Sequence, residues 1–125
     1  NNQTGYWEAM DHVNVAVGGD AAASVTVSIT NYTSVIGAKT TFSGKGGAFV
    51  HRSSSGAGDF NFTYIATLRP EDSNGNSASF GESVAMIDEK TVVVGAPNWS
   101  SSGRQIGAAF IFQEDPNGKW VQTQK

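Results

Sequence analysis

The chain has 125 residues, a mass of 13.1 kDa and a net charge of -3, and it contains no cysteine. This length fits one ordinary domain, the eight basic side chains leave no footprint for nucleic acid, and the lack of cysteine excludes disulfides, thiolate metal sites and cysteine nucleophiles. No apolar run approaches the roughly 18–20 residues that span a bilayer, and no cleavable signal stands at Asn1, so an exported chain would be a mature form or a fragment.

The N-terminal segment, 1–23, contains one candidate strand. Residues 12–17 alternate between polar and apolar side chains and end at a Gly-Gly pair, a pattern typical of a β-strand followed by a turn. Helical periodicity is almost absent along the whole chain. Because this strand has no obvious place in the sheets that follow, it could complete the sheet of a neighbouring chain by strand addition.

The second half of the chain predicts a four-stranded antiparallel meander. Strands at 83–87 and 91–94 are separated by the short polar turn 88–90. Two further strands, at 107–112 and 119–122, are linked by a segment that contains Asn-Gly after a proline, which is a strong hairpin signal.

The first half carries the same landmarks about 58 positions earlier. Gly-Ala at 37–38 precedes Gly-Gly-Ala-Phe at 46–49, as Gly-Ala at 95–96 precedes Gly-Ala-Ala-Phe at 107–110. Alternating strands and glycine turns occur in any small all-β domain, but the shared order of landmarks favours an internal repeat. We therefore divide the chain into the N-terminal segment, a first copy over 24–72 and a second copy over 73–125.

The second copy resembles an FG-GAP repeat, the blade of integrin-α-type β-propellers. Both name-giving motifs are present, as Phe80-Gly81 and Gly95-Ala96-Pro97. The resemblance is strong over 80–120 and weak over 24–68, where Ala-Ala replaces the first motif and a lysine replaces the proline of the second. It implies an all-β fold with two consecutive four-stranded antiparallel blades plus one extra N-terminal strand. It also implies an extracellular or cell-surface setting and binding or adhesion rather than a reaction.

We expect no metal site and no cofactor. Calcium-binding blades of this family carry an Asp-x-Asp-x-Asp-Gly loop between their first two strands, whereas here that turn is 88–90 in the second copy and 30–33 in the first. Neither turn supplies the 6–8 oxygen ligands that calcium takes. The oxygen-rich stretch 72–76 is interpreted as a solvated connector, and the two histidines, His12 and His51, lack further ligands.

We also expect no enzyme. The glycine-rich stretch 43–47 lacks the spacing of a phosphate-binding loop, and no Gly-x-Ser-x-Gly elbow is present. Asp11 and His12 could orient a serine, but nothing in the sequence supplies the groups that would stabilise an oxyanion.

Four Asn-x-Ser/Thr sequons are the clearest chemical signal in the sequence. Three of them fall at turns or strand edges of the two copies, where a glycan would project into solvent. We predict a glycan on at least one of these three if the chain is exported from a eukaryotic cell, and we rank the terminal sequon last. The sequon asparagines are Asn2, Asn31, Asn61 and Asn98.

Two blades do not close a propeller, which needs ~4–8. The chain is therefore a piece of a longer propeller, a unit that assembles with other copies, or two sheets packed face to face. The favoured function is a non-enzymatic extracellular structural or adhesive glycoprotein that self-associates through strand edges and blade faces, giving a filament if the contacts do not close. The alternative is a propeller fragment that binds a protein or glycan through loops such as 40–46 and 97–106.

Overall fold

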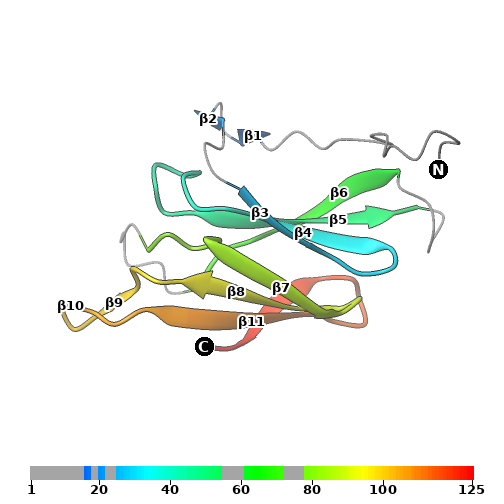
Figure 1. The fold of residues 1–125 in the computed structure, drawn as a ribbon. Helices are drawn as coiled ribbons and strands as arrows, with labels where there is room; N and C mark the ends of the chain where they lie inside the picture. Colours follow the sequence, from blue (N-terminus) through cyan, green and yellow to red (C-terminus); the bar gives the residue numbers. More distant parts are fainter. Residues whose placement is uncertain (1–15, 18–19, 22–24, 55–60, 72–77) are drawn as a thin grey trace, which may run out of the picture.

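The computed structural model describes residues 16–17, 20–21, 25–54, 61–71 and 78–125. Its architecture is all-β, with two four-stranded antiparallel sheets and two short two-stranded ribbons. The two large sheets lie face to face, the first above the second in Figure 1. The predicted fold class, two consecutive four-stranded blades, is confirmed.

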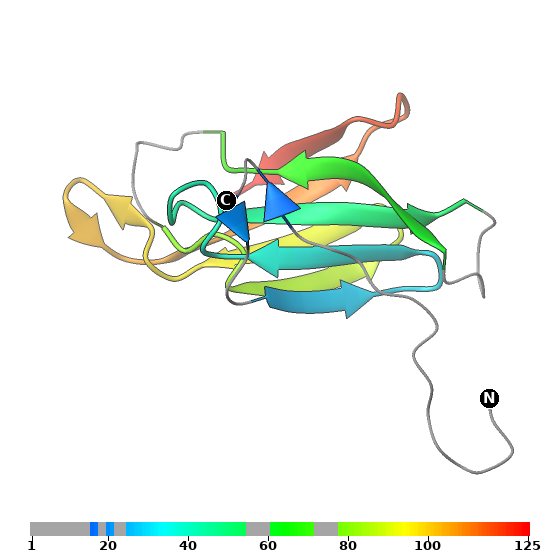
Figure 2. The same cartoon turned by 90° about the horizontal axis from the view of Figure 1, so that it is seen from above.

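The first sheet is a meander of β3 (Val25–Ile29), β4 (Thr33–Ala38), β5 (Gly47–Ser53) and β6 (Phe62–Leu68). β-branched and aromatic side chains dominate these segments, and such residues favour the pleated backbone. Figure 2 shows the four strands side by side in this order. The central strands, β4 and β5, are almost completely buried, whereas β3 is exposed at every second residue.

The second sheet repeats this order with β7 (Ser83–Asp88), β8 (Thr91–Ala96), β11 (Ala108–Glu114) and β12 (Trp120–Gln124). The predicted Asn-Gly hairpin between the last two strands is present. Asp115 Oδ1 accepts hydrogen bonds from the backbone N–H groups of Asn117 and Lys119, each at 2.9 Å. Gly118 has a φ of 83°, which the turn requires and glycine adopts without strain.

Strand register makes the two sheets residue-by-residue counterparts. Gly37 pairs with Ala48 between β4 and β5, as Gly95 pairs with Ala109 between β8 and β11. At the other end of the same strands, Thr33 pairs with Arg52 as Thr91 pairs with Gln113. We use "counterpart" for such equivalent positions throughout. The internal repeat predicted from the sequence is thus a repeat of strand order and pairing.

A second hairpin interrupts the second sheet and was not predicted. β9 (Ser100–Ser101) pairs with β10 (Arg104–Gln105) in the connection between β8 and β11. Ser102 and Gly103 between them have φ values of 52° and 77°. Two successive positive φ values are typical of a type I′ hairpin turn. The Ser-Gly pair at these positions was therefore the sequence signal that could have predicted this hairpin.

The N-terminal region departs from the single strand expected at 12–17. β1 (Ala16–Val17) pairs with β2 (Asp20–Ala21) as a two-stranded ribbon. This ribbon lies above the first sheet, on the side away from the second (Figure 1). Residues 12–15 lie outside the described residues.

One apolar core lies between the two sheets. Phe80, Phe110 and Phe112 form edge-to-face ring pairs with centroids 5.5 and 5.9 Å apart, and Trp99 packs on Phe110 at 5.0 Å. The inward side chains of β8 and β11 are buried there. The buried members of the core are Val35, Ala48, Val50, Leu68, Ala78, Phe80, Val92, Val94, Ala96, Trp99, Phe110 and Phe112.

The Phe80-Gly81 motif joins the sheets by direct backbone contact. Phe80 forms an isolated parallel bridge with Gly46 of the first sheet. Gly81 has a φ of 94°, and a Cβ built there would overlap the carbonyl oxygen of Gly47. A side chain would therefore be both strained and blocked at Gly81, which is the physical reason for glycine in this motif.

Candidate functional site

The candidate site is the face of the second sheet that points away from the first, and we call it the open face. Along β7, β8, β11 and β12 every second residue points outward, and these residues are mostly apolar and exposed or half-buried. Ile87, for example, is 61% exposed. The apolar members of the open face are Ala85, Ile87, Val93, Ala109, Ile111 and Val121.

The counterpart of the open face is the inner face of the first sheet, which the second sheet covers. Thr26 Oγ1 donates a hydrogen bond to the carbonyl of Gly81 at 3.2 Å. Ser28 Oγ accepts one from the backbone N–H of Met86 at 2.9 Å. Above Gly37 there is no room for a Cβ, which would meet the Gly81 backbone and the Val84 side chain. At β3 and β4, the inner face of the first sheet is therefore covered by hydrogen bonds and close packing with the second sheet.

Two ion pairs connect the sheets at opposite ends. Arg52 Nη1 and Glu114 Oε2 lie 2.9 Å apart, and Lys39 Nζ and Glu82 Oε1 lie 3.1 Å apart. Arg52 also donates to the carbonyl of Glu89 at 2.9 Å. The Glu114 side chain is only 9% exposed, so its charge depends on the arginine for compensation.

The β7–β8 turn is held against the first sheet through the Glu89 carboxylate. Its Oε1 accepts a hydrogen bond from the backbone N–H of Asn31 at 2.9 Å. Burial raises the pKa of Glu89, but hydrogen bonds from the side chains and amides of residues 30–33 outweigh it and leave the pKa below its usual value. This end of the inter-sheet contact is thus built on an ionised carboxylate.

His51 lies on the opposite face of the first sheet, against the ring of Tyr64 at a centroid distance of 5.9 Å. Burial lowers the pKa of His51, and a hydrogen bond with the Phe49 backbone offsets only part of this effect. A neutral imidazole in an aromatic contact is a structural residue, and within the described part of the chain no group of three or more His, Cys, Asp or Glu could hold a metal ion.

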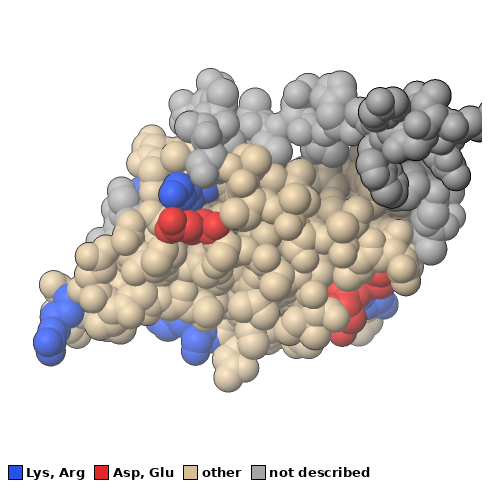
Figure 3. Space-filling model, in the orientation of Figure 1, with Lys and Arg blue, Asp and Glu red and all other residues tan. Residues whose placement is uncertain are grey.

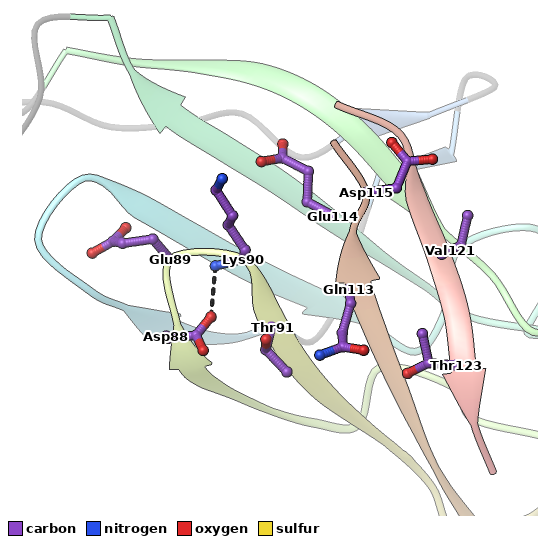
Figure 4. Close-up of a pocket in the computed structure, with 9 residues that line it drawn as sticks. All are labelled: Asp88, Glu89, Lys90, Thr91, Gln113, Glu114, Asp115, Val121 and Thr123. Atoms are coloured by element: carbon purple, nitrogen blue, oxygen red, sulfur yellow. Dashed lines mark hydrogen bonds between the residues drawn. The ribbon is translucent and has the colours of Figure 1, made fainter. Parts of the chain in front are cut away.

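A hollow of about 570 Å³ opens at the end of the open face. Figure 4 shows the β7–β8 turn on one side of it and the ends of β11 and β12 on the other. Asp88 Oδ1 accepts a hydrogen bond from the Lys90 backbone N–H at 2.8 Å, so this carboxylate stabilises the turn. The hollow is lined by Asp88, Glu89, Lys90, Thr91, Gln113, Glu114, Asp115, Val121 and Thr123.

The predicted glycosylation sites lie away from the open face where the structure describes them. Asn31, Asn61 and Asn98 are exposed, while Asn2 lies outside the described residues. The Asn98 amide is engaged on both sides, because Nδ2 donates to Ser79 Oγ at 2.8 Å and Oδ1 accepts from Gln105 Nε2 at 2.7 Å. A glycan on Asn98 would disturb this network.

The two loops proposed as ligand sites differ in accessibility. In loop 40–46 the Phe42 ring is half-buried, stacked on Phe49 with centroids 6.3 Å apart and partly covered by Arg69 at 4.2 Å. Loop 97–106 projects with the β9–β10 hairpin, and Ile106 is 67% exposed. Of the two, only the second presents an exposed apolar side chain.

Figure 3 shows tan atoms over most of one side of the molecule. Charged atoms lie around its margin, as a blue and red pair at the upper left, blue patches at the left end and lower edge, and a red cluster with blue beside it at the right. Among the residues that the structure describes, no helix is long and apolar enough to cross a membrane.

Consecutive antiparallel four-stranded sheets with a Phe-Gly turn between them define a blade-repeat protein. Residues 62–112 match the FG-GAP repeat family. The match runs from β6 to β11 and includes both motifs, Phe80-Gly81 and Gly95-Ala96-Pro97. No curated protein and no solved structure matches the chain significantly.

The family match and the expected repeat boundaries differ in a way that the fold explains. The match begins in the last strand of the first sheet and stops before β12. It does not reach the first copy before residue 62, where the sequence motifs are degenerate. The first sheet nevertheless has the strand order and pairing of the second, so it is a blade by structure.

Proposed function

We propose that this chain is a non-enzymatic extracellular building block, structural or adhesive, that self-associates through blade faces and strand edges. No chemistry is assigned to it, because its ionised and hydrogen-bonded side chains serve the contact between the two sheets. We propose no cofactor and no nucleic acid or membrane-embedded partner. In this proposal the function of the protein is to form contacts with other copies of itself.

The observation that carries this proposal is the open face. Six apolar side chains of one sheet lie together on a face that nothing in the described part of the chain covers. In the first sheet, Val35, Ala48 and Val50 occupy the positions of three of them, Val93, Ala109 and Ile111, and are buried in the core. Contiguous apolar surface of this kind marks interaction sites in soluble proteins. Burying this surface would contribute about 25 cal/mol of stabilisation per Å². A small chain buries a smaller fraction of its surface on folding than a large one, so this stabilisation would be a substantial addition.

Sedimentation velocity over a wide concentration range tests self-association. We expect species larger than the 13.1 kDa chain that increase with concentration. A single monomeric species up to millimolar concentration would contradict the proposal. Native protein should be used, so that any glycans are present.

We further propose export and N-glycosylation at Asn31 or Asn61. Both asparagines are exposed and lie outside the open face, so a glycan there would leave the apolar surface accessible. Peptide mass spectrometry of native protein should find a glycan on at least one of them. Unmodified asparagine at all four sequons would contradict this part of the proposal.

A second candidate function is ligand binding through the β9–β10 hairpin. It is favoured by the exposure of Ile106 next to the exposed Arg104 at the projecting end of the second sheet. Here the ligand would be a protein or glycan, and the chain would be one part of a larger propeller. A variant with Ile106→Ser and Arg104→Ser should then lose ligand capture while its oligomeric state stays unchanged.

A further inference from the structure

We propose that the open face binds β3 of a second copy of this chain, head to tail, in the way the first sheet binds β7 of the same chain. This inference rests on the proposed self-association and adds the two surfaces that make the contact. One is the open face of the second sheet. The other is the outward side of β3, where Val25, Val27 and Ile29 are 54%, 67% and 54% exposed.

The contact between the two sheets of one chain is the template. The inner face of the first sheet and the open face of the second are counterparts, because β4 and β8 pair with β5 and β11 in the same register. In the same way β3 is the counterpart of β7, so that Val27 corresponds to Val84 and Ile29 to Met86. On β3, each chain therefore carries the counterpart of the β7 part of this contact, and a chain that carries both surfaces can assemble head to tail. The outward side chains of β4 and β5, such as Ile36, Phe49 and His51, are already buried, so the contact between copies is made by β3 alone.

The template places specific residues together. Within one chain Val84 packs over Gly37, so closely that a Cβ on the glycine would lie 2.8 Å from Val84 Cγ1. Gly95, the counterpart of Gly37, has space on its open side, and a Cβ there would meet only Ser83 within its own sheet. Between copies, Val27 takes the place of Val84 and packs over Gly95.

The hollow beside the open face also has a counterpart in the template. Thr91 and Gln113 line it, and they correspond to Thr33 and Arg52 of the first sheet. In the first sheet this position is filled by the β7–β8 turn, whose Glu89 carbonyl accepts from Arg52. The β3–β4 turn of a second copy, residues 30–32, would fill the hollow in the same manner. Because a glycan on Asn31 would prevent this, the inference requires the proposed glycan to be on Asn61.

Charge distinguishes the contact between copies from the contact within the chain. The internal contact has two ion pairs, Arg52–Glu114 and Lys39–Glu82. At the four counterpart positions the chain has only neutral residues, which are Gln113, Ser53, Pro97 and Val25. These four positions therefore supply no ion pair to the contact between copies and bury no uncompensated charge in it.

Disulfide trapping in mixed chains is the direct test. The template pairs Ala85 with Ile29 of the second copy, because their counterparts Ser28 and Met86 are 2.9 Å apart from Oγ to N. The chain contains no native cysteine, so each variant carries one thiol. Chains with Ala85→Cys mixed with chains with Ile29→Cys should give a mixed dimer under mild oxidation, identified by mass. Ala85→Cys mixed with Ile65→Cys, a 39% exposed position on β6, is the matched control and should not.

Charge insertion gives an independent measurement. Val27→Glu should raise the concentration needed for assembly by at least about tenfold, because it buries an unpaired carboxylate. Ile65→Glu should leave that concentration unchanged. Thermal unfolding of both variants at low concentration checks that the monomer remains folded, as expected for exposed positions. Raising NaCl from 0.05 to 1 M should not weaken assembly of the unmodified chain.

The outcomes separate the inference from the proposed function. If the chain assembles but the Ala85–Ile29 disulfide fails to form and Val27→Glu assembles normally, the inference is wrong and self-association uses other surfaces. If the chain is monomeric at every concentration, both are wrong. If a longer native protein is monomeric and its own further blade protects Ala85→Cys from alkylation, the open face is covered within one chain, and the inference is also overturned.

Discussion

Two glycines at the same place in the repeat show how one blade becomes an interface while the other remains open. Gly37 in β4 lies under the Gly81 backbone and Val84, with no space for a methyl group, whereas the nearest atoms to a methyl group on Gly95 in β8 belong to Ser83 of the same sheet. Their strand, register and residue type are identical. The difference comes only from what covers them. Equivalent residues thus stabilise the fold in the first blade and are available for binding in the second.

The largest effect is expected from truncating the covered side of β11. Phe110 is fully buried between the sheets, so Phe110→Ala should lower the free energy of unfolding by about 3–5 kcal/mol. Its neighbour Ile111 points to the open face and is half-buried, so Ile111→Ala should cost only about 1 kcal/mol. Urea denaturation of both variants checks the difference. Equal losses would mean that the two sides of β11 are covered equally.

The glycine pair itself gives the next prediction. Gly37→Ala forces a methyl group against the Gly81 backbone and should destabilise by about 1–3 kcal/mol through overpacking. Gly95→Ala meets only the Ser83 hydroxyl, which is able to rotate away, and its effect should stay below about 0.5 kcal/mol. The measurement is the unfolding midpoint of each variant at a concentration where the chain is monomeric. A larger loss for Gly95→Ala would reverse the assignment of covered and open faces.

Removing the inter-sheet ion pair should have a smaller effect. Arg52→Met leaves Glu114 without its partner, and we expect a loss of about 2 kcal/mol because the arginine is itself 24% exposed and the carboxylate 9% exposed. The counterpart change on the open face, Gln113→Met, should be nearly neutral. A double-mutant cycle with Glu114→Gln isolates the pair. Zero coupling in that cycle would show that the arginine contributes by packing alone.

Acid should lower the free energy of unfolding in two steps. The folded pKa of His51 is lowered by burial, so stability falls as the pH drops below its usual value of about 6.5 and levels off below the folded pKa. The folded pKa of Glu89 is also lowered, so its contribution is present above about 4.3 and is lost as the pH falls through the folded pKa. Glu89→Gln should remove the second step and leave the first. Unfolding curves between pH 7.5 and 3 test both, and a second step that persists in Glu89→Gln would assign it to another carboxylate.

Local sequence patterns predicted strands where the signals are local. Alternation and turn residues placed the four strands of the second sheet within a few residues, and the Asn117-Gly118 turn formed as expected. For the first sheet, the repeated landmarks predicted a second four-stranded blade without bounds for its strands. The Phe-Gly and Gly-Ala-Pro motifs are short and contiguous, so they identify the repeat directly from the order of residues. Trp99 was missed, because inside a sequon it was interpreted as a turn residue, although it is 4% exposed in the core.

What the sequence determined by itself is the strands of the second sheet, their order, and the presence of two four-stranded blades. Which face of each sheet is covered was decided only by tertiary structure. The stretch Val92-Val93-Val94 is apolar on both sides of its strand, so alternation cannot tell the buried side from the open one. The ion pairs join residues that are more than 40 positions apart, and no local pattern encodes their meeting. The open face exists because the second sheet packs on the first through only one of its two faces. Which face packs is decided by the tertiary contacts between the sheets.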